Sequence, residues 1–374
     1  MIALTRTDTS LVGRWWWTVD RWILAAIALL VFVGVILTLA ASPAVAERIG
    51  LEPFHFARRQ LGFMALALAL MFAVSLASPV AIRRIAVIGF LVALLMLAAT
   101  LVVGAEIKGA TRWLYIAGVS LQPSEFVKPF FVVVTAWMLS LQKRVEGVPG
   151  NLIAGVSALL VVGLLLGQPD IGMAVVVSAV WCSQVFVAGL PLVWVGALLA
   201  FGGAAMIALY TMVPHVASRI DRFFDPSLGD TYQVQTAIDA FANGGLFGRG
   251  PGEGIGKRVL PDAHTDFIFA VAGEEYGLLV CLFIVALFAY ITLRGYRRLA
   301  GEDSLFIMLA AGGLLTQFGL QAVINMGVNL HLLPTKGMTL PFISYGGSSL
   351  LALSVGMGMV IALTRRRPRH EVEP

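Results

Sequence analysis

The segment 244–275 brings glycine, basic and acidic residues together at the edge of an apolar stretch. Its loop ends in His264, Thr265 and Asp266, and the apolar stretch follows at once. A carboxylate near positive charge stays ionised and can accept a proton from a substrate hydroxyl. Charged residues at membrane depth also need partners, water or a function. This segment is therefore the first candidate for an active site.

Asp266 allows two interpretations. Its carboxylate, or the threonine before it, could cap a helix that begins at Phe267, which stabilises a helix by about 1 kcal/mol. Alternatively, Asp266 is a general base, because Lys257, Arg258 and His264 bring cations toward the same membrane edge. The residues alone leave both interpretations open.

Glycines occupy every second position from 248 to 256, which lets backbone approach a ligand or follow a tight irregular path. A phosphate-binding P-loop would require glycine at 251 and serine or threonine at 258. The chain has Pro251 and Arg258 at these positions. We therefore exclude a nucleotide site.

Glu274 and Glu275 lie about 12 Å further along the helix that follows Asp266, at a rise of 1.5 Å per residue. Adjacent helical side chains project about 100° apart, so we expect that they do not both face one partner. They could form buried ion pairs with basic residues of neighbouring helices, or one of them could line a shared cavity.

A second acidic and basic pair begins the fourth apolar stretch, where Glu125 and Lys128 are three residues apart and share a helix face. They could form a mutual salt bridge or line a polar cavity. The outer loop before them contains Arg112 and Trp113. The tryptophan could stack on a sugar or anchor the membrane interface.

The last outer loop contains Pro334 and Pro341 with several small residues, which predicts broken backbone at a helix mouth. Lys336 is its one charged residue. It could extend along the membrane interface or neutralise a phosphate. The 5 histidines of the chain show no metal-ligand spacing, so we expect no dedicated structural metal site.

The elements that carry these residues are predicted to be membrane helices. The chain is 59% hydrophobic and only 13% charged, with a mean hydropathy of +0.89, whereas a soluble domain has roughly a quarter of charged residues. A helix needs about 20 apolar residues to cross the hydrocarbon. We predict an all-α polytopic membrane protein with about ten spans, near 22–41, 60–77, 85–103, 125–141, 151–167, 172–189, 191–212, 267–293, 304–326 and 342–363.

The distribution of arginine and lysine predicts the orientation of these spans, because short cytoplasmic loops are enriched in both. Basic residues precede the first span, fill every second short loop and close the chain. We expect a single membrane domain over 1–374 with cytoplasmic tails 1–21 and 364–374. The long loop 213–266, between the seventh and eighth spans, then lies outside. The net charge of +5 largely reflects this bias, and no basic helix suggests nucleic-acid binding.

Several long motifs in order resemble the SEDS family of bacterial cell-wall proteins, which includes RodA and FtsW. The resemblance runs from the first span to the last. Its most specific parts are Gln122-Pro123-Ser124-Glu125, Gln168-Pro169-Asp170, Pro261-Asp262-Ala263-His264-Thr265-Asp266-Phe267, and the stretch from Leu340 to Ser349 that includes Ser344. The residues 333–337, Leu-Pro-Thr-Lys-Gly, look like the FtsW branch, which acts in division.

The resemblance implies glycosyl transfer that joins lipid II units into glycan strands on the outer face of the bacterial inner membrane. It assigns the essential catalytic role to Asp266, and it matches Glu125, Lys128, Trp113 and Lys336 to functional positions of the family. It also implies a partner, a class B penicillin-binding transpeptidase, and action with other division proteins at the septum.

An inverting displacement needs one base and cationic help on the diphosphate leaving group, not the two carboxylates of a retaining glycosidase. We expect Asp266 to deprotonate the acceptor 4-hydroxyl. Lys336, Lys257 or Arg258, with or without a divalent cation such as Mg²⁺ or Mn²⁺, would stabilise the pyrophosphate. The competing hypotheses are a lipid II flippase, a RodA-type elongation polymerase and a non-catalytic scaffold.

Overall fold

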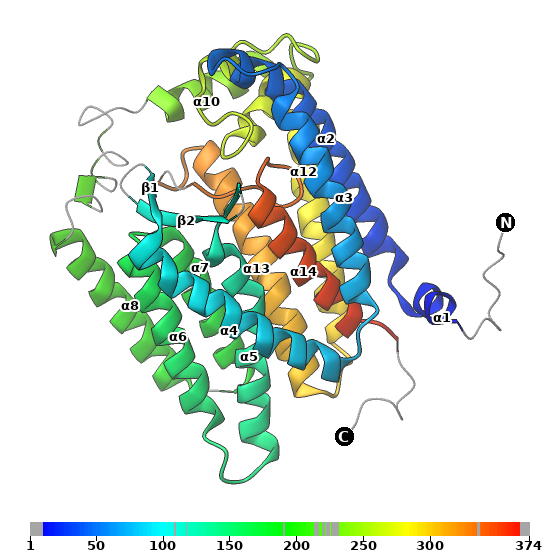
Figure 1. The fold of residues 1–374 in the computed structure, drawn as a ribbon, viewed down its shortest axis with the longest axis vertical. Coiled ribbons are helices and arrows are strands. Elements are labelled where there is room, and N and C mark those ends of the chain that lie inside the picture. The colour runs from blue at the N-terminus through cyan, green and yellow to red at the C-terminus, as the bar shows by residue number, and fades with distance from the viewer. Residues whose placement is uncertain are drawn as a thin grey trace.

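The structure is a computed structural model that describes residues 10–107, 110–116, 118–189, 191–212, 217–218, 221, 225, 232–334 and 337–366. The described chain is mainly helical (Figure 1). Its helices are α1 (Leu11–Thr18), α2 (Arg21–Arg48), α3 (His55–Ser75), α4 (Pro79–Val103), α5 (Pro123–Arg144), α6 (Gly150–Gly167), α7 (Ile171–Val187), α8 (Leu192–Met212), α10 (Tyr232–Gly244), α11 (Gly256–Val259), α12 (Ile268–Leu299), α13 (Leu305–Asn329) and α14 (Gly347–Leu363).

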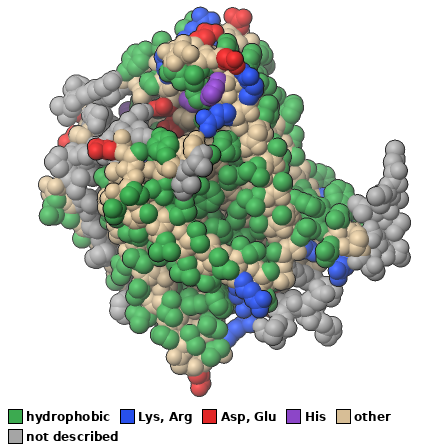
Figure 2. Space-filling model, viewed as in Figure 1, with side chains coloured by type: hydrophobic (Ala, Val, Ile, Leu, Met, Phe, Trp, Pro, Cys, Tyr) green, Lys and Arg blue, Asp and Glu red, His purple; other side chains and the backbone are tan. Residues whose placement is uncertain are grey.

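The long helices are explained by their apolar composition. Among the described residues, 7 helices are long and apolar enough to cross a membrane, namely α2, α3, α4, α5, α6, α12 and α13. The most apolar windows of α5 and α13 are 72% buried, against 28–39% in the other five, so these two helices form the centre of the bundle. Apolar side chains cover the middle of the face shown in Figure 2, while charged side chains gather toward its two ends. This distribution suits a surrounding bilayer.

Each predicted span coincides largely with a helix, although the count of ten crossings stays a prediction. α7 and α14 are apolar but only 17 residues long, at the lower limit of the length that crosses the hydrocarbon. The amide of Arg366, after α14, donates to the carbonyl of Thr18 at 3.1 Å. The first and last described segments therefore meet at one end of the bundle, which requires an even number of crossings.

The segment before α5 forms a small sheet that the sequence did not predict. β1 (Ala105–Ile107), β2 (Ala110–Ile116) and β3 (Val119–Leu121) pair antiparallel in the order β1-β2-β3. Threonine, tryptophan, tyrosine and isoleucine in β2 favour a strand. The β1-β2 register is irregular at Arg112, because Ala105 pairs with Trp113 while Glu106 pairs with Thr111.

α12 is interrupted at Gly277, whose φ of 78° and ψ of −178° lie outside the helical region. The carbonyls of Glu274 and Glu275 instead accept hydrogen bonds from the amides of Arg249 and Gly250, at 2.9 and 3.0 Å. Beyond the break, the amide of Leu278 donates to the carbonyl of residue 245 at 2.9 Å. The glycine-rich loop thus replaces helical hydrogen bonds that a continuous helix would make itself.

A charge cluster joins α2 to α12 at the opposite end from Asp266. Asp20 accepts hydrogen bonds from Arg294 and Arg298, at 2.9 and 2.7 Å. Burial acts to raise the pKa of Asp20, but these bonds and an amide bond outweigh it, and the net effect lowers the pKa. Nearby, Trp15 is buried and donates to Ser75 at 2.8 Å, so this tryptophan joins α1 to the end of α3.

Candidate active site

The tripeptide 264–266 is held through its main-chain carbonyls by the loop between α13 and α14 and by α13. The amide of Tyr345 donates to the carbonyl of His264 at 2.9 Å. The hydroxyl of Ser344 donates to the carbonyl of Thr265 at 2.6 Å and accepts from the amide of Leu340 at 2.8 Å. Ser344 therefore fixes both the tripeptide and its own loop.

The third carbonyl, that of Asp266, accepts from two side-chain amides of α13. Asn325 Nδ2 and Asn329 Nδ2 donate to it at 2.9 and 2.8 Å. Asn329 Oδ1 also accepts from the amide of Ala270 in the first turn of α12, at 3.1 Å. Phe267, at the N-cap position, makes no side-chain cap bond. Part of the capping role that the sequence suggested for Thr265 or Asp266 is thus supplied by a residue of another helix.

The Asp266 carboxylate is partly buried and faces the loop that follows α13. A Cβ added to Gly337 would lie 3.2 Å from Asp266 Oδ2, so the glycine keeps this approach open. Thr265 is also partly buried, and its hydroxyl donates to the carbonyl of Asp262 at 3.2 Å. Lys336, predicted to face this site, lies outside the described residues.

His264 is packed between aromatic rings and is not the cation that the sequence analysis expected. Its ring lies 4.3 Å from that of Phe56 and 5.3 Å from that of Tyr345, measured between centroids. Burial lowers the pKa of His264 to about 4, with nearby Arg48 acting in the same direction and Asp262 opposing. The imidazole is therefore neutral at pH 7, and Arg48, which donates to the carbonyl of Pro261 at 2.5 Å, supplies positive charge there.

Glu274 and Glu275 both face the glycine-rich loop but accept hydrogen bonds from different residues of it. Glu274 accepts from the amides of Ile255 and Gly256, at 3.1 and 2.9 Å. Glu275 accepts from the amide of Gly252 at 3.0 Å. The glycine-rich loop wraps around the turn of α12 that carries both residues. Side chains that project about 100° apart therefore reach different residues of this one loop.

Lys257 pairs with Glu275 instead of reaching toward a ligand. Its ammonium contacts the Glu275 carboxylate, donates to the carbonyl of Ala40 at 3.1 Å, and leaves Lys257 only 6% exposed. We therefore assign Lys257 to holding the loop, not to a leaving group. Arg258, the next residue, is exposed.

Glu125 and Lys128 form the mutual ion pair that their spacing allowed, at 2.9 Å. Lys128 also donates to Gln321 of α13 at 3.0 Å. Gln321 donates onward to the carbonyl of Thr339 at 3.1 Å, and the Thr339 hydroxyl lies 2.6 Å from that of Ser349. This polar network reaches the same loop that Asp266 faces.

Arg112 extends from β2 to the start of α7. Its Nη2 donates to the carbonyl of Pro169 at 2.6 Å, and its Nε lies 3.5 Å from Asp170 Oδ2. Burial raises the pKa of Asp170, while Arg112 opposes this rise. Trp113 is partly buried. Asp170 was part of a recognised motif, but the sequence analysis did not place it among the site residues.

The asparagines of α13 were not among the residues predicted for the site. Gln317, Gln321, Asn325 and Asn329 recur every four residues in a helix that is otherwise mostly apolar. A polar stripe in a membrane helix faces the protein interior and finds partners there. The four-residue spacing of these amides was therefore the sequence signal that could have identified Asn325 and Asn329.

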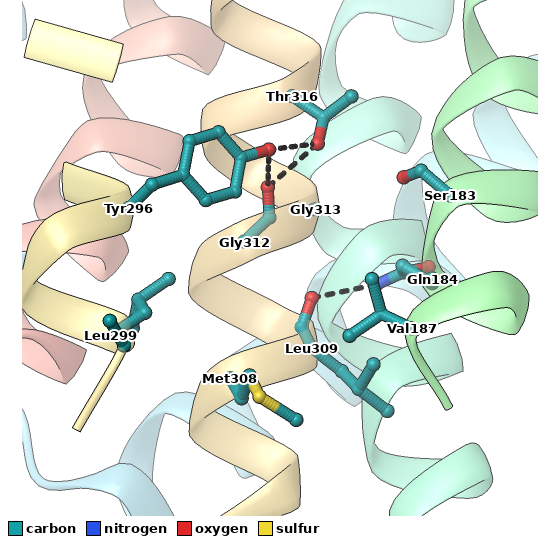
Figure 3. Close-up of a pocket in the computed structure, with 11 residues that line it drawn as sticks. Ser183, Gln184, Val187, Tyr296, Leu299, Met308, Leu309, Gly312, Gly313 and Thr316 are labelled. Carbon is teal, nitrogen blue, oxygen red and sulfur yellow. Dashed lines mark hydrogen bonds between the residues drawn. The ribbon is translucent and has the colours of Figure 1, made fainter. Parts of the chain in front are cut away.

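A cavity of about 250 Å³ between α7, α12 and α13 lies toward the other end of α12 from Asp266 (Figure 3). Its polar groups are largely bonded within the protein: the Tyr296 hydroxyl lies 2.6 Å from that of Thr316, and Gln184 donates to the carbonyl of Leu309 at 3.2 Å. The remaining walls are mainly apolar. None of the residues that line this cavity carries a carboxylate, imidazole, thiol or amine.

The apolar helical bundle carries at one end a polar network and a carboxylate on a fixed main chain, which defines a polytopic membrane protein with its candidate site at that end. The chain belongs to the FtsW, RodA and SpoVE family, described as cell cycle proteins, whose sequence model matches residues 20–369. Two relatives carry the name "Probable peptidoglycan glycosyltransferase FtsW". The protein of Caulobacter vibrioides is 46% identical, with 98% of this chain and 94% of the relative covered. The protein of Coxiella burnetii is 35% identical, with 93% of this chain and 96% of the relative covered.

Solved structures agree with this family. A chain from a structure titled "Structural coordination of polymerization and crosslinking by a peptidoglycan synthase complex" has a TM-score of 0.77 and 29% identity, with 92% of this chain and 97% of that chain covered. The rod shape determining protein RodA of Thermus thermophilus has a TM-score of 0.67 and 29% identity, with 92% and 96% covered. The multi-pass helical fold is therefore shared.

Proposed function

We propose that this chain is a peptidoglycan glycosyltransferase that polymerises lipid II at the outer face of the inner membrane. Its relatives carry that name over nearly their whole length, and the FtsW naming supports a role in septal wall synthesis. The observation that carries the proposal is the fixing of three consecutive carbonyls at 264–266. This arrangement holds the main chain of Asp266 in place next to the open approach at Gly337.

The reaction inverts the sugar carbon in a single displacement. The acceptor 4-hydroxyl forms a bond to the anomeric carbon of the donor as the bond to the diphosphate breaks, and Asp266 takes the hydroxyl proton. An aspartate is ordinarily a weak base at neutral pH. Positioning of the reactants and stabilisation of the departing pyrophosphate therefore supply most of the lowering of the barrier.

The cations for the pyrophosphate are Arg258 and Lys336, with Arg48 near the tripeptide. Among the described residues, no group of three histidine, cysteine or acidic side chains is placed to hold a metal ion. Mg²⁺ usually binds one or two carboxylates together with substrate phosphates. Asp266 fits this mode as one carboxylate ligand, and an ion shared with the diphosphate would neutralise charge on the leaving group.

Polymerisation of lipid II by the purified chain tests this function. The wild-type protein should form glycan strands, and Asp266→Asn should lower the rate by roughly 10²–10⁴-fold, the usual contribution of a general base. Asp262→Asn, four residues earlier in the same loop, serves as the matched control. Native-rate polymerisation by Asp266→Asn would remove Asp266 as the base, whereas translocation of lipid II without glycan product would identify a flippase.

The partner follows from the same family. The structural neighbour belongs to a complex that couples polymerization to crosslinking. We infer that a class B penicillin-binding transpeptidase crosslinks the strands made by this chain at the division septum, with other division proteins. We also infer that both described terminal segments face the cytoplasm, because the loops on their side of the membrane are positively charged. Stimulation of the purified chain by such a transpeptidase would test the pairing.

A further inference from the structure

Four side-chain amides of α13 form a stripe along one face of the helix, at Gln317, Gln321, Asn325 and Asn329. Their exposures are 4%, 0%, 1% and 0%. Burying an amide is costly unless it is hydrogen-bonded. The partners of the last three amides therefore indicate what this stripe does.

Asn325 joins two segments that are distant in the sequence. Its single Nδ2 group donates to the carbonyl of Asp266 at 2.9 Å and to the carbonyl of Met338 at 2.6 Å. An amide NH₂ has two donors, so both are used here. The tripeptide 264–266 and the loop after α13 are thus fixed to one another through one rigid planar group.

Asn329 adds a second constraint on Asp266. It donates to the Asp266 carbonyl at 2.8 Å while its Oδ1 accepts from Ala270 at 3.1 Å. The carbonyl oxygen of Asp266, which has two lone pairs, therefore receives two donors. Asn329 ties the main chain of Asp266 to the first turn of α12.

Gln321 completes the connection on the side of the buried ion pair. It accepts from Lys128 at 3.0 Å and donates to the carbonyl of Thr339, the residue after Met338, at 3.1 Å. The loop 337–340 is consequently held at successive residues by two amides of one helix. Lys336 precedes this loop in the sequence.

We propose that Asn325 and Asn329 are positioning residues that set the Asp266 carboxylate relative to the loop 337–340. This inference rests on the proposed glycosyl transfer with Asp266 as the base. They act through the Asp266 main chain, and neither is proposed to touch the substrate. A displacement of a reacting group by about 1 Å can cost on the order of 10²-fold in rate. Loss of these bonds should therefore lower kcat more than it changes KM.

Aspartate substitutions test the proposal because they keep side-chain size and remove the donors. In Asn329→Asp, a carboxylate oxygen can still accept from Ala270, so only the donated bonds are lost. Asn325→Asp removes both of its donated bonds. Gln317→Glu is the matched control, because it also introduces a carboxylic acid on this face of α13. Gln317 Oε1 has no hydrogen-bond partner among the described residues. Asn325→Ser and Asn329→Ser repeat the test without a new charge.

We expect kcat for lipid II polymerisation to fall about 10- to 100-fold in the Asn325 and Asn329 variants, with KM within about twofold of the wild type. Amide hydrogen exchange at 264–267 should also accelerate in these variants and not in Gln317→Glu. Native kcat and native exchange in all four asparagine variants would overturn the positioning role while leaving the proposed function intact. An equal loss of kcat in Gln317→Glu would also overturn it, since the effect would then be general. A wild-type protein without polymerase activity would overturn the proposed function, and this inference with it.

Discussion

Glu125 and Lys128 form an ion pair of 2.9 Å with side chains only 3% and 2% exposed. Both charges have been removed from water, and Lys128 donates one further hydrogen bond to Gln321. The desolvation of each charge is offset only while its partner is present. The pair therefore behaves as one unit in the stability of the bundle.

Removal of one member of this pair should destabilise the protein more than removal of both. We expect Lys128→Met to lower the free energy of unfolding by about 3–5 kcal/mol, because a buried carboxylate remains unpaired. The double variant Glu125→Gln with Lys128→Met should recover part of that loss. Thermal unfolding in detergent measures both. Arg58→Met, which breaks the exposed ion pair with Glu52, is the control and should have little effect.

The carboxylate of Glu274 should hold the glycine-rich loop in place. Glu274→Gln replaces one acceptor oxygen by a donor, so the two amides of Ile255 and Gly256 can no longer both be satisfied. We expect a loss of about 1–3 kcal/mol and faster hydrogen exchange at these two amides. Glu253→Gln on the exposed part of the same loop should change stability by less than about 0.5 kcal/mol. Equal hydrogen-exchange rates at these two amides in Glu274→Gln and Glu253→Gln would show that Glu274 does not hold the loop.

Two glycines of this loop should respond differently to alanine. Gly248 and Gly252 have φ of +81° and +88°, so alanine is strained at both. A Cβ at 248 would also lie 2.2 Å from the carbonyl oxygen of Glu275, whereas at 252 nothing lies within 4 Å. Gly252→Ala should cost about 1–2 kcal/mol, as expected for left-handed backbone alone. Gly248→Ala should separate the loop from α12 and give far less folded protein in size-exclusion chromatography.

The buried His264 should make the protein less stable in mild acid. Its pKa is about 4 in the folded chain and about 6.5 in an unfolded one, so between these values the unfolded state binds the extra proton. The free energy of unfolding should then fall by up to about 3 kcal/mol as the pH drops from about 6.5 to 4. His264→Phe keeps an aromatic ring between Phe56 and Tyr345 but cannot titrate. The free energy of unfolding of this variant should lose this part of its pH dependence. An unchanged slope of that free energy against pH would exclude His264 as the cause.

Local sequence patterns were sufficient for the long apolar helices and for one part of the site, but not for α1, α10 and α11. Apolar runs predicted the positions of α2 to α8 and α12 to α14, because a membrane helix must satisfy its own backbone hydrogen bonds. The spacing of Glu125 and Lys128 allowed their ion pair, since residues three apart meet on one helix face. The sheet at 105–121 was missed, although its β-branched and aromatic residues were a usable signal.

The sequence by itself determined that apolar helices dominate this chain, and its motifs singled out Asp266. Tertiary structure alone decided what surrounds that residue. The contacts of Asn325 and Asn329 with Asp266 span 59 and 63 residues, and no periodic pattern specifies which carbonyl a buried amide will reach. The same holds for Lys257 and His264, whose charges looked available until packing placed one against Glu275 and the other between two rings. Composition sets which side chains must be buried or paired, whereas only the packed helices determine with which partner.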